Sequence, residues 1–343
     1  MNPPYLRPSS YPYRATRARW RLAMLLGVLL VPGAGHLAHG QAPVSVQPRI
    51  DAPAHPLIVA HRGGTADTPE NTIAAFRNAL ANGADALWMT VQVTRDGVPV
   101  MYRPADLAAL TDGNGPVGTL DYAAVSRLNA GYAFKRTDAS GQIEYPYRAH
   151  PLPIPTLREA LQAVPPNVPI MLDMKQTPVA PLVEAVARVL DEAHAWPRVR
   201  LYSTDADATA LMSRYPQARL FESRDATRQR LVQLAFNERC DTPPAPGTWV
   251  GIEFHRQVEV VEHYTLGAGI SKVDAHWWTQ AAVRCFKSRG DVKVVAFGIE
   301  TPSDYERATA LGIDAVMTDS PHDLRAALTA APQVPTGPHA SDE

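Results

Sequence analysis

Short apolar segments alternate with longer amphipathic segments along most of this chain. The short segments are typical of buried strands. The longer ones, in which apolar positions recur at helical spacing, are typical of helices that cover a sheet. Repeated alternation of the two predicts parallel β/α units. We therefore expect the α/β class, with a (β/α)8 TIM barrel as the architecture.

The pattern contains more candidate strands than this barrel requires. Suitable segments lie at residues 57–61, 86–93, 98–103, 169–175, 199–203, 218–222, 249–254, 292–298 and 315–318. A (β/α)8 barrel has one strand fewer. The segment 249–254 lies in the least regular part of the sequence. The pattern alone does not decide which segment lies outside the barrel.

Several amphipathic segments begin with residues that favour a helix start. Thr156 with Glu159 predicts a capping box. The pairs Thr68-Pro69 and Thr301-Pro302 place a capping hydroxyl before a proline, whose missing N–H is tolerated in the first turn. The widest apolar stripe predicts a helix within residues 179–195.

Residues 107–155, after the third expected strand, do not follow the alternation. This segment is rich in glycine, tyrosine and turn residues. It is long enough to form a subdomain over the C-terminal mouth of the barrel, where barrel enzymes carry their active sites. We therefore assign the barrel to residues 57–331 and an insertion to residues 107–155.

Both ends of the chain differ from this repeat. Four arginines precede the apolar run 22–31, and small residues follow it. This order predicts a signal peptide at residues 1–41, with an uncleaved N-terminal anchor as the alternative. We expect an exported protein, periplasmic or extracellular, with no stable membrane span after cleavage. Residues 42–56 are expected to be a linker, and residues 332–343 a disordered tail.

Composition sets further limits on function. Hydrophobic residues make up 45% of the 343 positions, which suffices for a large core, and the formal net charge is −1. A near-zero charge argues against general nucleic-acid binding, which requires a basic surface. Cys240 and Cys285 could pair in an oxidising compartment, but the sequence does not decide between a disulfide and two free thiols.

Short motifs occur in a fixed order along the barrel region. They are AHRG at 60–63 with PENT at 69–72, GAD at 83–85, TRDGVPV at 94–100, DMK at 173–175, and GIDAV at 312–316 with TDSP at 318–321. Together they resemble the signature of the glycerophosphodiester phosphodiesterase family. The resemblance spans residues 57–328.

The resemblance implies an enzyme that hydrolyses glycerophosphodiesters to glycerol 3-phosphate and an alcohol. In that family three carboxylates hold Ca²⁺ or Mg²⁺, and two histidines act as general acid and base. The substrate is anionic, so its charge must be neutralised while a proton is delivered to the leaving oxygen.

Part of the family's site is retained. His61 stands at the position of the first catalytic histidine, and Arg62 at that of the phosphate-binding arginine. Lys175 is retained and should face the same way as Asp173. Glu70 is also retained, and we expect it to support the turn or the helix start rather than the chemistry.

Other positions depart from the family pattern. Trp88 and Thr90 occupy the places of two metal-binding carboxylates. Arg103 replaces the second histidine, and an arginine does not exchange protons near neutral pH. Asp173 replaces a glutamate, and a single carboxylate does not hold Mg²⁺ or Ca²⁺ firmly. We therefore expect no metal cofactor and no two-histidine mechanism.

Phosphate binding does not depend on the lost groups. Arg62, Arg103 and Lys175 could bind a phosphate together, since a guanidinium matches phosphate geometry. Alternatively, Arg103 pairs with Asp173 or points to solvent. Phe297-Gly298 stands where the resemblance places a Trp-Thr pair near the glycerol.

Three functional hypotheses follow. The one we favour is a weakened or inactive homologue that binds a small phosphorylated ligand, such as a glycerophosphodiester. The second is a metal-independent phosphodiesterase that uses His61. The third is a non-catalytic interaction protein of the cell envelope, whose protein partner the sequence does not identify.

Overall fold

The structure is a computed structural model that describes residues 55–330. The expected signal peptide, most of the expected linker and the expected tail lie outside the described residues. Among residues 55–330, no helix combines the length and the apolar character needed to cross a bilayer.

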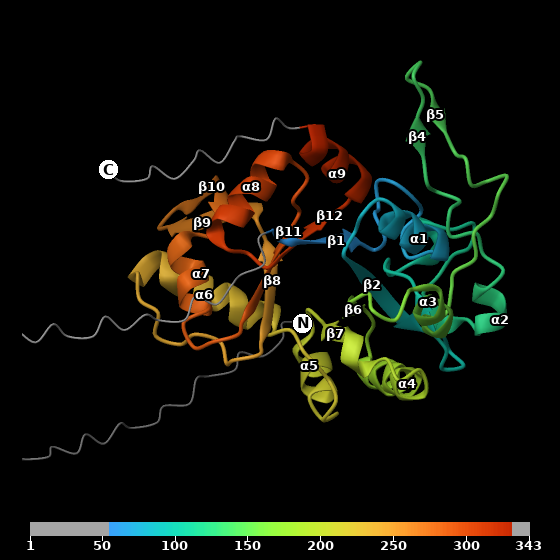
Figure 1. Ribbon diagram of the computed structural model, residues 1–343, viewed down its shortest axis with the longest axis horizontal. Helices are drawn as coiled ribbons and strands as arrows, with labels where there is room; N and C mark the ends of the chain where they lie inside the picture. The colour runs from blue at the N-terminus through green and yellow to red at the C-terminus, as the bar shows by residue number, and fades with distance from the viewer. Residues whose placement is uncertain (1–54, 331–343) are drawn as a thin grey trace, which may run out of the picture. The chain divides into compact units, whose positions relative to one another are not determined.

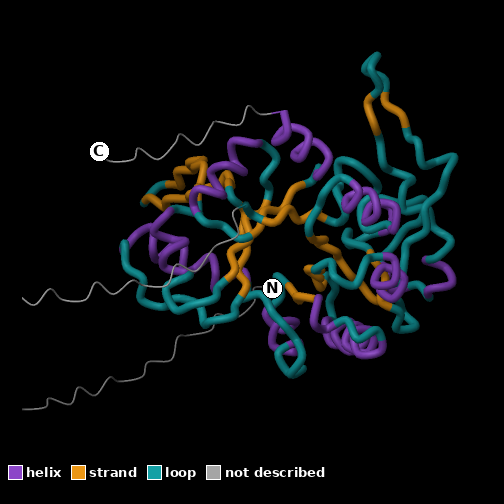
Figure 2. Tube along the Cα trace, in the orientation of Figure 1, coloured by secondary structure: helices purple, strands orange, loops and turns teal. Residues whose placement is uncertain are grey.

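Parallel strands form the centre of the fold (Figure 2). They pair in the order β7-β6-β2-β1-β12-β11-β8. Their bounds are β1 (Leu57–His61), β2 (Ala86–Val93), β6 (Ile170–Met174), β7 (Val199–Tyr202), β8 (Trp249–Glu253), β11 (Lys293–Phe297) and β12 (Ala315–Thr318).

A short segment closes this ring between β7 and β8. Leu220 pairs in parallel with Leu201 of β7, and Phe221 pairs in parallel with Trp249 of β8. The backbone N–H of Phe221 also donates to the carbonyl of Leu201 at 2.9 Å. The expected strand at 218–222 therefore takes the remaining barrel position, and the predicted TIM-barrel fold is confirmed.

The strand outside the barrel is the third expected one, not the segment 249–254. Residues 98–103 yield β3 (Pro99–Met101), which pairs antiparallel with β2. The link between β2 and β3 is a tight turn with Gly97 at φ 82°. A parallel pairing needs a crossover of roughly a dozen residues or more, which this turn does not provide.

Helices surround the strands (Figure 1). They are α1 (Ile73–Ala81), α3 (Leu157–Ala163), α4 (Val179–Glu192), α5 (Ala206–Met212), α6 (Arg224–Asn237), α7 (Gln280–Phe286), α8 (Pro302–Leu311) and α9 (Pro321–Ala330). The capping box of Thr156 and Glu159 and the Thr301 cap of α8 are confirmed. The start predicted at Thr68-Pro69 is wrong, because Thr72 caps α1 and its hydroxyl accepts the Ala75 N–H.

The insertion has a small core of its own. It contains η1 (Leu107–Ala109), η2 (Val117–Thr119), α2 (Tyr122–Val125), and the strands β4 (Arg136–Thr137) and β5 (Ile143–Glu144), which form a hairpin that projects outward in Figure 1. Its buried side chains include Leu107, Val117 and Val125, which pack beneath Val100 and Tyr102. The insertion is thus anchored to β3 and its flanking residues.

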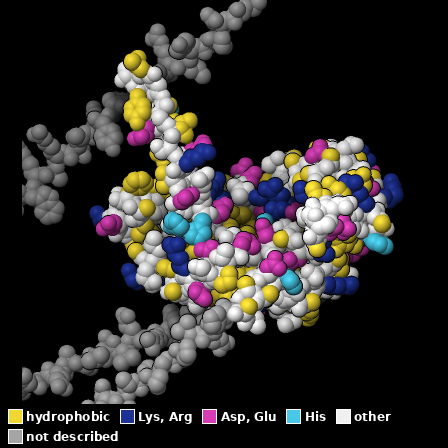
Figure 3. Space-filling view, turned by 90° about the horizontal axis from the view of Figure 1, so that it is seen from above, with side chains coloured by type: hydrophobic (Ala, Val, Ile, Leu, Met, Phe, Trp, Pro, Cys, Tyr) yellow, Lys and Arg dark blue, Asp and Glu magenta, His cyan; other side chains and the backbone are white. Residues whose placement is uncertain are grey.

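A second hairpin was not predicted from the sequence. Strands β9 (His255–Tyr264) and β10 (Gly267–His276) pair antiparallel over their whole length. The hairpin projects from the molecule and exposes apolar side chains, including a fully exposed Leu266 at its turn (Figure 3). Its apolar residues lie on both faces, so the sequence lacks the clear alternation that marks a half-buried strand.

The two cysteines form a disulfide. Cys240 follows α6, Cys285 lies in α7, and their Cα atoms are 5.6 Å apart. The bond links two neighbouring helices of the barrel's outer layer. This settles the alternative that the sequence left open.

Candidate functional site

The side chains that stand at the family's site positions meet at the C-terminal ends of the barrel strands. His61 ends β1, and Asp173 and Lys175 lie at the end of β6. They line a cavity of about 360 Å³ together with Arg62 and Arg103. The expected catalytic and phosphate-binding side chains are therefore brought to one cavity, which we call the mouth cavity.

His61 is held by a carboxylate. Its Nδ1 lies 2.6 Å from Oδ1 of Asp319, which follows β12. Burial acts to raise the pKa of Asp319, but the hydrogen bond to His61 and the charge of that ring hold this pKa below its ordinary value. In the neutral ring, a proton on Nδ1 leaves the lone pair on Nε2. This arrangement suits a general base.

Arg62 is fixed by Glu70. The Arg62 Nη1 donates to Glu70 Oε2 at 2.5 Å, and the two side chains are only 18% and 12% exposed. The backbone of Arg62 is left-handed, with φ at 50°, and its carbonyl accepts the N–H of Asn71. Glu70 therefore holds the Arg62 side chain beside the turn after β1. The Arg62 Nε is buried without a hydrogen-bond partner among the described residues. The residue also lines the mouth cavity.

Lys175, not Arg103, is the ion-pair partner of Asp173. The Lys175 Nζ lies 3.5 Å from Asp173 Oδ1 and donates to Thr204 Oγ1 at 2.9 Å. Among residues 55–330, Arg103 makes no ion pair with Asp173. The expected alternative of an Arg103–Asp173 pair is thus wrong. Arg103 is an exposed side chain that lines the cavity.

The two positions of the missing carboxylates lie inside the barrel. Trp88 is 3% exposed and packs edge to face against Tyr202 and Phe297, with ring centroids 4.9 and 5.2 Å away. Thr90 is fully buried, and its hydroxyl has no partner among the described residues. Phe297, which replaces the family's tryptophan, thus contacts Trp88 and lines the mouth cavity.

These side chains do not fit the divalent cation that the family resemblance implies. An indole and a hydroxyl occupy two ligand positions, and Asp173 is paired with Lys175. In the described part of the chain, no group of three or more His, Cys, Asp or Glu residues is arranged to hold a metal ion. A hard cation needs several oxygen ligands.

Several side chains of the mouth cavity were missed from the sequence. Arg224 binds both carboxylate oxygens of Glu253, and Glu300 accepts the Thr318 hydroxyl at 2.8 Å and the Asp319 N–H at 2.9 Å. Burial raises the pKa of Glu300, although these hydrogen bonds oppose the shift. Most of these residues stand at or just after a strand's C-terminal end. Reading that position of every expected strand would have found them.

Asparagine in place of Asp173 is expected to raise the free energy of unfolding at neutral pH. Burial raises the pKa of Asp173, and Lys175, Arg62 and Arg103 only partly oppose this shift. A carboxyl group whose pKa rises on folding stabilises the protein below its unfolded pKa of about 3.9, and this contribution is lost as the pH rises through the folded pKa. Asp173→Asn should therefore gain most where wild-type Asp173 is ionised.

Urea denaturation of both proteins between acidic and neutral pH measures this effect. The control is Asp121→Asn, because the hydrogen bond to Arg95 lowers the pKa of the exposed Asp121, so no gain is expected there. A less stable Asp173→Asn protein at neutral pH would contradict the expectation.

Comparison with known proteins agrees with the geometry. The glycerophosphoryl diester phosphodiesterase family model matches residues 61–323. The uncharacterized protein Rv2277c of Mycobacterium tuberculosis is 52% identical over 266 residues, which cover 78% of this chain and 87% of that protein. The crystal structure of its glycerophosphoryl diester phosphodiesterase domain matches with a TM-score of 0.74 and 49% identity, covering 79% of this chain and 98% of that one.

A more distant structure shares the fold. It is an Oleispira antarctica phosphodiesterase in complex with the product sn-glycerol-3-phosphate, with a TM-score of 0.58 and 22% identity over 80% of this chain and 98% of that one. The match to the family model covers most of the barrel, and the M. tuberculosis protein is 52% identical over 78% of this chain. This chain belongs to the glycerophosphoryl diester phosphodiesterase family.

Proposed function

We propose that this protein binds a small phosphorylated ligand, such as a glycerophosphodiester, in the mouth cavity without a divalent cation, and that it hydrolyses the ligand weakly or not at all. The observation that carries the proposal is the convergence of Arg62, Arg103 and Lys175 on one cavity beside His61.

The three cations supply the anion-binding part of this proposal. Arg62 and Arg103 line the mouth cavity, and Arg103 makes no ion pair with Asp173 among the described residues. The Lys175 ammonium also lines the cavity and donates to Thr204. Guanidinium and ammonium groups bind phosphate through charge-assisted hydrogen bonds. The complex of the Oleispira antarctica enzyme with sn-glycerol-3-phosphate supports a ligand of this class.

The replaced residues support weakened hydrolysis. A catalytic cation contributes several kcal/mol of charge stabilisation in the transition state, and a proton-transfer group typically contributes a factor of about 10²–10⁴. Trp88 and Thr90 offer no anionic ligand for the cation, and Arg103 does not exchange a proton at neutral pH. The cations lining the cavity hold the phosphate but replace only part of these contributions.

A second candidate function is metal-independent hydrolysis of a phosphodiester. The contact between His61 Nδ1 and Asp319 favours it, because an oriented imidazole is the group that general base catalysis needs. In this case His61 would be catalytic, and Arg62, Arg103 and Lys175 would take over the electrostatic role of the cation.

Export is a further part of the proposal. The disulfide between Cys240 and Cys285 supports an oxidising compartment, outside the cytosol, because cytosolic thiols are kept reduced. The order of basic, apolar and small residues within residues 1–41 supports the same location.

Glycerol 3-phosphate is expected to bind to the protein in excess chelator. Lys175→Gln should lower this affinity by roughly tenfold, because a charge-assisted hydrogen bond is worth about 1.5 kcal/mol or more. Isothermal titration calorimetry on the purified protein measures it. Arg228→Ala, which removes an exposed arginine of α6 that pairs with Asp225, is the control and should bind like wild type. Binding that requires Ca²⁺ or Mg²⁺ would contradict the proposal.

Turnover of glycerophosphocholine and glycerophosphoglycerol, measured in the same chelator, separates the two candidates. Binding without turnover supports the first. Turnover that survives chelation and disappears in His61→Ala supports the second. If the protein shows no binding and no turnover, both candidates are contradicted, and the non-catalytic envelope protein is the remaining hypothesis.

A further inference from the structure

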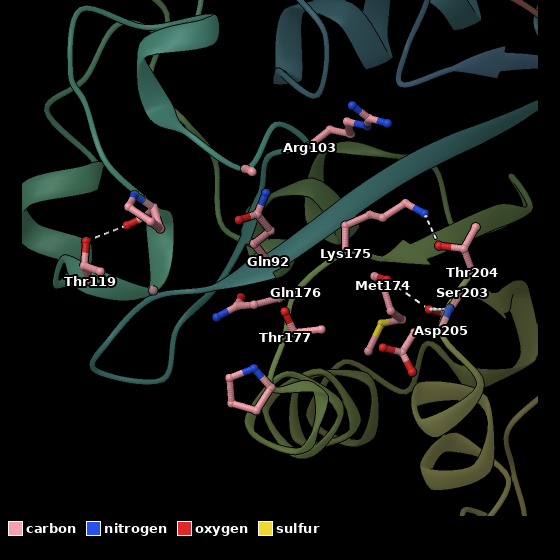
Figure 4. A pocket seen from close by; sticks show the side chains of 14 residues that line it. Gln92, Arg103, Thr119, Met174, Lys175, Gln176, Thr177, Ser203, Thr204 and Asp205 are labelled. Carbon is pink, nitrogen blue, oxygen red and sulfur yellow. Dashed lines mark hydrogen bonds between the residues drawn. The ribbon is translucent and has the colours of Figure 1, made fainter. Parts of the chain in front are cut away.

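A larger cavity borders the mouth cavity. Its volume is about 720 Å³, compared with about 360 Å³ for the mouth cavity. The two cavities share Arg103, Lys175 and Thr204 as a common wall. Figure 4 shows these three side chains among the residues that line the larger cavity. We call the larger space the side cavity. A phosphate held by the shared cations would have open space on both sides, and its two substituents could enter different cavities.

The side cavity is lined by groups that make hydrogen bonds with hydroxyls. Gln92 donates its amide N–H to the carbonyl of Pro104 at 2.8 Å, and Gln176 accepts the N–H of Val93 through its carbonyl oxygen. One oxygen of Asp205 accepts the N–H groups of Asp207 and Ala208 at the start of α5. In each of these side chains, one polar atom makes these hydrogen bonds. Among the described residues, the other polar atom of the amide or carboxylate makes no hydrogen bond, so it remains for a ligand.

The lining does not suit a quaternary ammonium group. No aromatic residue of the described chain lines the side cavity, whereas cation recognition of this kind relies on aromatic faces. The polar side chains of the lining favour an uncharged, hydroxyl-rich group.

The insertion supplies one side of this cavity. Pro116, Gly118 and Thr119 of the η2 region face Gln176 and Thr177, which follow β6. A Cβ atom on Gly118 would lie 2.8 Å from the amide nitrogen of Gln176. The absent side chain at this position lets the insertion approach Gln176 and leaves its amide in the cavity wall.

We propose that the side cavity binds the alcohol substituent of a phosphodiester and selects a hydroxyl-rich alcohol, such as a polyol or a sugar, over a quaternary ammonium alcohol. This rests on the proposed function, because the phosphate must lie at the shared wall. The volume of the side cavity falls within the range of about 300–1,000 Å³ that small-molecule sites occupy. It exceeds the need of glycerol, so it accommodates a ring such as inositol.

Calorimetry with three ligands tests the proposal on the purified protein in excess chelator. Glycerophosphoinositol is expected to bind at least about tenfold more tightly than glycerophosphocholine, since two additional hydrogen bonds contribute roughly 1.4 kcal/mol, the equivalent of that ratio. Glycerol 3-phosphate, which lacks the alcohol substituent, reports the phosphate site alone.

Thr119→Trp places an indole at the exposed rim of the side cavity. It should abolish the preference for glycerophosphoinositol and leave the affinity for glycerol 3-phosphate unchanged. Thr137→Trp, on the exposed strand β4 outside both cavities, is the matched control and should retain the preference.

The outcomes separate the two proposals. Equal affinities for the two diesters, with glycerol 3-phosphate still bound, overturn the side-cavity proposal and leave the proposed function intact. Tighter binding of glycerophosphocholine overturns it as well. Failure of all three ligands to bind overturns the proposed function, and the side-cavity proposal with it.

Discussion

Trp88→Glu is expected to lower the free energy of unfolding by more than about 4 kcal/mol and to create no cation site, although it restores a carboxylate that the family pattern has at this position. Trp88 is 3% exposed and surrounded by the rings of Tyr202, Phe221 and Phe297. Removing a buried tryptophan costs about 3–5 kcal/mol, and burying an unpaired carboxylate adds to this loss.

Urea denaturation with and without added Ca²⁺ or Mg²⁺ measures both parts of this expectation. Trp88→Phe is the matched control, because it keeps an aromatic ring and should lose much less stability. A Trp88→Glu protein that stays folded and gains stability with added cation would contradict the expectation that no cation site forms in this variant.

Arg62→Ala should lower the free energy of unfolding by about 3–5 kcal/mol, because it leaves the charge of Glu70 buried without its partner. The two side chains are 18% and 12% exposed and share a hydrogen bond of 2.5 Å. The backbone does not offset this loss, because the left-handed conformation at φ 50° is unfavourable for alanine and arginine alike.

A double-mutant cycle distinguishes this cause from a general packing effect. Arg62→Ala with Glu70→Ala should recover part of the loss, because the unpaired charge is removed as well. Arg158→Ala provides the exposed comparison: it breaks a pair with Glu192 in which both side chains are 46% exposed, and the expected change is below about 1 kcal/mol. A similar loss of unfolding free energy in Arg62→Ala and Arg158→Ala would contradict the argument from burial.

The sequence predicted most of the barrel because its strands are short apolar runs, and burial on both faces leaves that signature. It did not identify β3 as the strand outside the barrel, since β3 has the same composition. The evidence lay in the preceding turn, which is too short for a parallel crossover. The hairpin of β9 and β10 was missed because most of its residues are exposed. Burial therefore does not impose a regular order of apolar and polar positions on its sequence.

The site was predictable only where a motif fixed it. His61, Arg62 and Lys175 lie at positions that the motifs named, and the structure places all three in the mouth cavity. Glu253 and Arg224 pair across the end of β8, a contact between separate parts of the chain that no local pattern records. Asp319 belongs to a recognised motif, but its contact with His61 depends on β1 and β12 being neighbours in the ring.

The residues that flank the insertion 107–155 are joined to each other beside the barrel. Val100 pairs with Thr156, and the Met101 N–H donates to the Pro155 carbonyl at 2.8 Å, so the two ends of the insertion meet beside the barrel. Lengthening a loop whose ends are already joined costs little entropy. A change in the length of this segment would therefore alter the wall of the side cavity at little entropic cost and leave the strand register of the barrel unchanged.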